Sequence, residues 1–150
     1  MKRNLLVVLA WLALSVPAYA GELVNTAGAS RIALTGYDPV AFFTDAKPVH
    51  GSPSITSEHA GATYLFVNEE HRRLFAADPE RYAPQYGGFC AYGVALGALF
   101  PVDIGTWQIR DQKLYLNLNP EILEAFNADF RGNLAKAEAQ WTGLEKKYAP

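Results

Sequence analysis

The distribution of apolar positions predicts short strands over most of the chain and helices at its end. Residues 62–67 alternate between two faces that are both apolar, which predicts a strand covered on both sides. Residues 55–57 are expected to pair with this strand in antiparallel fashion across the turn 58–61. A second hairpin is expected from residues 106–110 and 113–118, because a two-residue connection between two apolar segments favours a tight turn.

Capping residues mark the expected helix starts. Asp38, followed by a proline, predicts a short helical turn, since proline suits the first helical position. Asn68 precedes two glutamates and predicts a helix to about Ala77, because acidic side chains are favoured in the first turn. Leu74 and Phe75 are expected to supply the buried side of this helix.

The end of the chain is predicted to be helical. Residues 119–121, Asn-Pro-Glu, form a start signal, and Ile122, Phe126 and Phe130 share a face at a spacing of four. A break is expected near Gly132. A second apolar stripe then follows at helical spacing, at Leu134, Ala137, Trp141, Leu144 and Tyr148.

Together these elements predict one α+β domain over residues 35–150, in which a small antiparallel sheet packs with several helices and a helical segment ends the chain. Residues 21–34, which begin as a small and polar segment, are expected to form a flexible N-terminal arm.

The first twenty residues predict export. Lys2 and Arg3 precede an apolar segment at 5–14, and residues 15–20 end in the small-residue pattern that signal peptidase requires, with cleavage expected after Ala20. The apolar segment is too short to span the roughly 30 Å of a bilayer core. We therefore expect a cleavable Sec-type signal peptide, a periplasmic location, and no stable membrane anchor after cleavage.

Charge narrows the range of partners. The chain has 13 basic and 15 acidic residues, and cleavage after Ala20 removes two of the basic ones, leaving a formal net charge of −4. Nucleic-acid binding depends on basic surfaces, so this balance argues against a nucleic-acid partner.

Cys90 is the single cysteine of the sequence, which excludes an internal disulfide. It follows Gly87 and Gly88 and is expected to open a short helix, where a thiolate is stabilised. Four roles remain open for it: a buried inert residue, a metal ligand, a nucleophile, or an intermolecular partner. Free cysteine is most often buried and behaves as a small apolar residue.

Candidate chemistry centres on Cys90. His71, or His59, brought beside it by folding would complete a soft metal site for copper or zinc, or a nucleophile–base pair. No phosphate-binding loop, nucleophile elbow or zinc-protease helix is present. The neighbouring glycines and aromatic side chains favour a third possibility, a site for a small apolar ligand, and its candidate residues are Tyr86, Phe89 and Tyr92.

These motifs resemble the YHS domain, and more narrowly the exported YHS-domain proteins of bacteria. The resemblance rests on residues 37–43 (Tyr-Asp-Pro-Val-Ala-Phe-Phe), 62–66 and 75–92. It covers residues 37 to about 97 well, and residues 102–148 are similar to the exported members too. The resemblance implies a compact α+β unit related to small treble-clef-like metal modules.

The resemblance also implies where a metal would lie. Metal-binding members of the family carry three cysteines, at positions where this sequence has Ala41, Val67 and His71. The inherited zinc site is therefore expected to be lost, while Cys90 is an addition typical of the exported branch. A different site that uses Cys90, with His71 or His59, remains open.

Three functions follow as hypotheses. The first is a periplasmic, non-enzymatic module that binds copper or zinc through Cys90. The second is a metal-free module that binds a small apolar ligand or another exported protein. The third, which has the least support in the sequence, is a thiol enzyme with Cys90 as its nucleophile.

Overall fold

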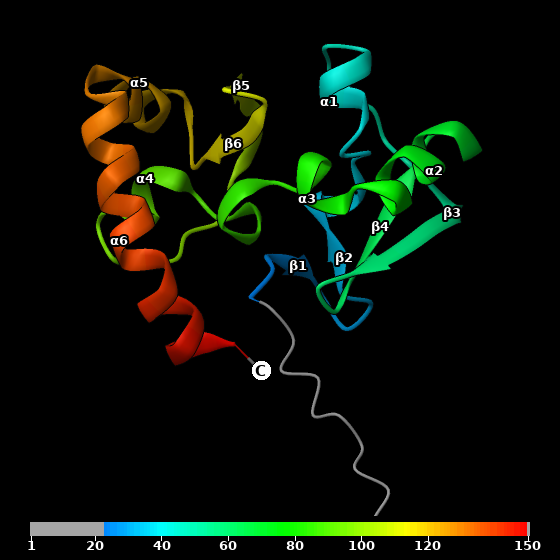
Figure 1. Ribbon diagram of the computed structural model, residues 1–150, viewed down its shortest axis with the longest axis horizontal. Helices are drawn as coiled ribbons and strands as arrows, with labels where there is room; N and C mark the ends of the chain where they lie inside the picture. The colour runs from blue at the N-terminus through cyan, green and yellow to red at the C-terminus, as the bar shows by residue number, and fades with distance from the viewer. Residues whose placement is uncertain (1–22, 150) are drawn as a thin grey trace, which may run out of the picture.

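The computed structural model describes residues 23–149, and it has the predicted α+β composition (Figure 1). The strands are β1 (Thr26–Ala27), β2 (Ile32–Ala33), β3 (Ser52–His59), β4 (Ala62–Phe66), β5 (Asp103–Arg110) and β6 (Lys113–Asn117). The helices are α1 (Ala41–Thr44), α2 (Glu69–Ala77), α3 (Pro79–Tyr82), α4 (Ala91–Ala95), α5 (Pro120–Ala128) and α6 (Phe130–Tyr148), with 3-10 turns η1 (Leu34–Gly36) and η2 (Gln85–Gly88). The expected signal peptide, residues 1–20, lies outside the described residues.

The first sheet has the strand order β1-β2-β4-β3 and is mixed, which corrects the expectation of a purely antiparallel sheet. β3 and β4 form the predicted antiparallel hairpin, but β2 pairs with β4 in parallel through Ile32 and Thr63. The reason is topological, since η1, α1 and β3 lie between β2 and β4 in the chain and return it in the same direction.

Residues 23–34, part of the expected flexible arm, include two short strands of this sheet. They contribute β1 and β2, and Leu23, Ala33 and Leu34 are buried. Burial of these apolar side chains fixes the segment to the rest of the protein.

The second predicted hairpin is confirmed as β5 and β6. Its turn residues Asp111 and Gln112 have φ values of 50° and 60°. Positive φ at both central residues is the conformation whose twist matches that of two antiparallel strands.

Helix α2 begins where Asn68 predicts, because the Asn68 side chain accepts a hydrogen bond from the backbone N–H of His71. Phe75 is fully buried, as expected, whereas the prediction for Leu74 is wrong, since this side chain is 37% exposed. Successive helical residues are rotated by about 100°, and α2 turns the side that carries His71 and Phe75 toward the protein.

The break between the last two helices, expected near Gly132, lies three residues earlier, at Asp129. Asp129 caps α6 by accepting a hydrogen bond from the Gly132 N–H at 3.0 Å. A Cβ at position 132 would collide with the Asp129 carboxylate, so glycine here permits the cap instead of ending a helix. Within residues 23–149, no helix is long and apolar enough to cross a membrane.

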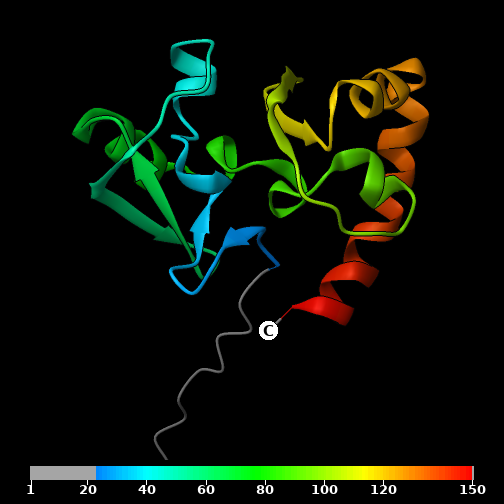
Figure 2. The ribbon, with the colours of Figure 1, turned by 180° about the vertical axis from the view of Figure 1, so that it is seen from behind.

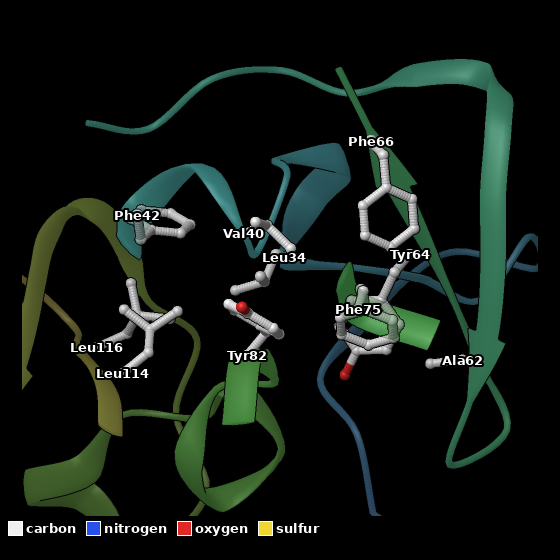
Figure 3. Close-up of a cluster of buried hydrophobic side chains, with 11 residues drawn as sticks. Leu34, Val40, Phe42, Ala62, Tyr64, Phe66, Phe75, Tyr82, Leu114 and Leu116 are labelled. Atoms are coloured by element: carbon white, nitrogen blue, oxygen red, sulfur yellow. The ribbon is translucent and has the colours of Figure 1, made fainter. Parts of the chain in front are cut away.

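Two cores share strand β6. Leu114 and Leu116 belong to the first core, while Tyr115 belongs to the second, because alternate residues of a strand face opposite sides. Figures 1 and 2 show the sheet of β1–β4 on one side and helices α4–α6 on the other, with β6 between them. We call residues 23–83, which run from β1 through α3, the first half of the molecule, and residues 84–149, from η2 through α6, the second half. In Figure 3 Leu114 and Leu116 lie beside Phe42, across from the cluster of Tyr64, Phe66 and Phe75.

Replacement of Leu116, 1% exposed, tests this arrangement. Leu116→Ala is expected to reduce the free energy of unfolding by about 2–5 kcal/mol, since it removes buried methyl groups and leaves a cavity. Leu74→Ala, on the exposed side of α2, is the matched control and is expected to stay within about 0.5 kcal/mol of the wild type. Urea denaturation measures both values, and equal losses would contradict the burial of Leu116 in the first core.

Candidate functional site

The carboxylate of Asp38 is fully buried and joins three segments of the first half. Its Oδ1 accepts hydrogen bonds from the backbone N–H of Val40 at 2.8 Å and of Ala41 at 3.3 Å. Its Oδ2 accepts one from the Val67 N–H at 2.9 Å and lies 2.7 Å from His71 Nδ1. The start of α1, the end of β4 and helix α2 therefore meet at one carboxylate.

The three positions at which the YHS resemblance places metal ligands all contact Asp38. Ala41 and Val67 offer only their backbone N–H groups, and His71, which is 7% exposed, already has protein partners at both ring nitrogens. His71 Nδ1 faces Asp38, and Nε2 lies 3.3 Å from Thr44 Oγ1 and 3.9 Å from Asp45 Oδ1. These residues do not fit a zinc site, which needs about four ligand atoms around one centre.

The structure places the candidate metal ligands in separate surroundings. His59 Nε2 lies 3.2 Å from Glu80 Oε1, and its ring contacts those of Tyr64 and Phe75. His71 contacts Asp38, while Cys90 packs in the other half of the molecule. In the part of the chain that the structure describes, no group of three or more His, Cys, Asp or Glu side chains is arranged to hold a metal ion.

Cys90 opens α4, as the sequence predicts, and is 1% exposed. Its Sγ accepts a hydrogen bond from the Gly93 N–H at 3.4 Å and donates one to Asn117 Oδ1 at 3.7 Å. An amide cannot serve as a general base, so this arrangement gives no support to a nucleophile–base pair with histidine.

Asn117, which sequence reasoning missed, connects β6 to α4. Its Oδ1 accepts a second hydrogen bond, from the Tyr92 N–H at 3.1 Å. Its backbone exchanges hydrogen bonds with the Thr106 hydroxyl, which fixes the residue in the hairpin. Its Nδ2 is buried and has no hydrogen-bond partner among the described residues, a rare condition in folded proteins. A polar residue directly after the apolar segment Leu114–Leu116 is the signal that marks it.

A concave pocket of about 190 Å³ opens beside the thiol, and we call it the Cys90 pocket. Its other lining residues are Tyr92, Gly93, Leu96, Phe100, Leu118 and Ile122.

The loop after α4 shapes this pocket. The Cys90 N–H donates to the Phe100 carbonyl at 3.1 Å, which brings Phe100 back beside α4. A Cβ at position 93 would lie 2.6 Å from the Phe100 ring, so glycine makes room for that ring. Leu96 and Phe100 remain 65% and 42% exposed, and the wall of the pocket is therefore open to solvent.

The three aromatic candidates separate in the structure. Tyr92 lines the Cys90 pocket, whereas Phe89 packs against the second core. Tyr86 lines a different pocket, and its hydroxyl donates to Glu138 Oε1 at 3.3 Å. The apolar residues Leu118 and Ile122, which complete the Cys90 pocket, were expected only as parts of a strand and a helix.

Two tyrosines of the second core have shifted pKa values. Burial, reinforced by the Glu138 carboxylate, raises the pKa of Tyr86 far above its ordinary value of 10.0. Burial also raises the pKa of Tyr115, with smaller contributions from Glu138 and Asp111. Both phenols therefore remain neutral at pH values at which exposed tyrosine ionises.

Comparison of the chain with protein-family models, with curated proteins and with solved structures gave no match. The similarity to YHS domains therefore stays a prediction from the sequence.

Asp38→Ala tests the convergence of α1, β4 and α2. The variant leaves three backbone N–H groups and His71 without their acceptor, and the free energy of unfolding is expected to fall by about 3–5 kcal/mol. Asp45→Ala is the control, because Asp45 is exposed and 3.9 Å from the same histidine, and its loss is expected to stay below about 1 kcal/mol. Similar denaturation midpoints for the two variants would contradict the role given to Asp38.

The tyrosine pKa values predict alkaline destabilisation. Above about pH 10 the unfolded chain loses phenol protons that the folded protein keeps at Tyr86 and Tyr115, so the unfolded state binds fewer protons and stability falls as the pH rises. Tyr86→Phe removes one of these phenols and is expected to reduce the slope. Urea midpoints measured between about pH 8 and pH 11 give the slope, and an unchanged slope in the variant would contradict this assignment.

Proposed function

We propose that this protein is an exported, non-enzymatic binding module that takes a small, mostly apolar molecule in the Cys90 pocket. The observation that carries the proposal is an open hollow whose exposed wall is apolar. Single exposed apolar side chains are common on proteins, but Leu96 and Phe100 flank a concavity lined by five further residues of low polarity.

The size of the pocket sets the size of the ligand. An apolar cavity of roughly 150 Å³ in another protein binds benzene. The Cys90 pocket, at about 190 Å³, therefore suits a compact molecule with a single ring or a short branched chain.

A buried polar side chain, that of Asn117, lies next to the lining residue Leu118 in the sequence. Asn117 hydrogen-bonds the thiol that lines it, and the Asn117 Nδ2 donor is unpaired among the described residues. Ligand sites are commonly apolar with a few fixed polar groups that orient the ligand. A compact ligand with a single polar atom, such as a cyclic ketone, suits a mostly apolar lining of this kind.

Copper or zinc binding through Cys90 has less support. Metals of this kind prefer thiolate or imidazole ligands, and the polar side chain hydrogen-bonded to Cys90 is an amide. The thiol-enzyme hypothesis has least support, for the same reason. The export part of the proposal rests on the sequence of residues 1–20 and on the similarity to exported YHS-domain proteins.

An NMR titration with cyclohexanone tests the ligand class on protein purified from the periplasm. We expect saturable shifts of the backbone amides of Cys90, Tyr92 and Leu96, and of the side-chain amide of Asn117. Phe100→Ser is expected to weaken binding by about tenfold, since it removes an aromatic wall. Val67→Ser is the matched control, because Val67 is similarly exposed but belongs to the other half of the molecule.

Several outcomes of this experiment would contradict the proposal. Shifts spread over the surface, or equal effects of Phe100→Ser and Val67→Ser, would show that the pocket is not the site. Stoichiometric copper or zinc in the purified protein, lost in Cys90→Ala, would replace it with the metal hypothesis. An intact mass that differs from the mass of a chain beginning at Gly21 would contradict cleavage after Ala20.

A further inference from the structure

A second pocket, of about 150 Å³, lies between the two halves of the molecule, and we call it the acidic pocket. Its rim brings together the first half, with the end of β3, β4 and α3, and the second half, with η2 and α6. The side chains that carry the argument are His59, Tyr64, Glu80, Tyr86, Trp141 and Glu145.

Aromatic rings form part of the wall. Tyr86 and Trp141 meet edge to face with their ring centroids 5.6 Å apart. Tyr64 and Tyr86 are nearly buried, so neighbouring side chains hold their rings in place. The face of an aromatic ring carries partial negative charge and attracts organic cations.

The charged groups of the wall favour the same kind of ligand. Glu80 and Glu145 are among the lining residues, and no lysine or arginine of the described part of the chain lines the pocket. Glu80 lies at the rim, where its side chain is 80% exposed and its Oε1 contacts His59 Nε2 at 3.2 Å. Two acidic groups beside aromatic rings produce a negative potential that selects against anions.

The backbone beside the pocket is fixed in advance. Tyr86 and Gly87 have φ values of 54° and 58°, and the Asn25 N–H donates to the Gly87 carbonyl at 2.8 Å. A Cβ at position 87 would collide with the Leu23 carbonyl, so this approach requires glycine. These contacts therefore fix the distance between the backbone at Leu23, on one edge of the pocket, and the aromatic wall at Tyr86.

We propose that the acidic pocket binds a small organic cation, with an ammonium group against the rings of Tyr86 and Trp141 and between the carboxylates of Glu80 and Glu145. Its volume matches a molecule about as large as benzene, so the ligand class is a compact primary or quaternary amine. This site is separate from the Cys90 pocket, and no residue lines both.

Calorimetric titration of the purified protein with choline chloride, at constant ionic strength, tests the proposal. Binding is expected with a dissociation constant on the order of millimolar, as befits a ligand of few atoms. The neutral isostere of choline, in which carbon replaces the charged nitrogen, is expected not to bind. Equal binding of the isostere, or no binding of choline at concentrations well above the millimolar range, would overturn the proposal.

Variants test whether choline binds in the acidic pocket. Trp141→Leu keeps an apolar side chain without the ring and is expected to weaken binding about tenfold. Glu145→Gln is expected to weaken it several-fold, whereas Glu124→Gln, an exposed glutamate on α5, is the matched control and is expected to leave it unchanged. Phe100→Ser is expected to leave choline binding unchanged, so that failure at one pocket is distinguishable from failure at the other. Circular dichroism verifies that each variant is folded, and equal losses in Glu145→Gln and Glu124→Gln would contradict the site.

Discussion

A buried carboxylate determines how the first half of this protein is assembled. Moving the Asp38 charge out of water is costly, and the cost is offset only where donors converge on both of its oxygens. Three backbone N–H groups and one imidazole do so, and they come from α1, from the end of β4 and from α2. Hydrogen-bond geometry therefore specifies the relative position of these segments, and it does so more narrowly than apolar packing alone.

A second buried polar residue, Asn117, performs a comparable task in the other half, but its hydrogen bonding is incomplete. β6 connects the two, since Leu114 and Leu116 pack in the first core and the strand ends at Asn117. Asp38 has partners at both oxygens, whereas Asn117 retains one unpaired donor. Asn117 therefore differs from Asp38 in one respect: the desolvation of its buried donor is not offset by a hydrogen bond among the described residues.

Helix caps and tight turns could be predicted from the sequence, whereas the pairing of distant strands could not. Asn68 and the turn at Asp111 act through residues at most three positions away, and both were predicted correctly. The parallel pairing of β2 with β4 joins residues about thirty positions apart, and no local pattern encodes it. Gly132 shows the same limit at short range, because a glycine that ends a helix and a glycine that admits an aspartate cap look alike in a sequence.

The glycine-rich segment explains why the candidate site was only half predictable. Composition singled out Tyr86 and Tyr92 together, yet positive φ at Tyr86 and Gly87 turns the chain between them, and they line different pockets. The ligands that we propose for the two pockets have opposite chemistry. An ammonium group in the Cys90 pocket would lose its hydration among apolar side chains, and an apolar molecule in the acidic pocket would cover carboxylates without pairing them. Desolvation therefore makes the two sites chemically independent, although one short segment of the chain contributes to both.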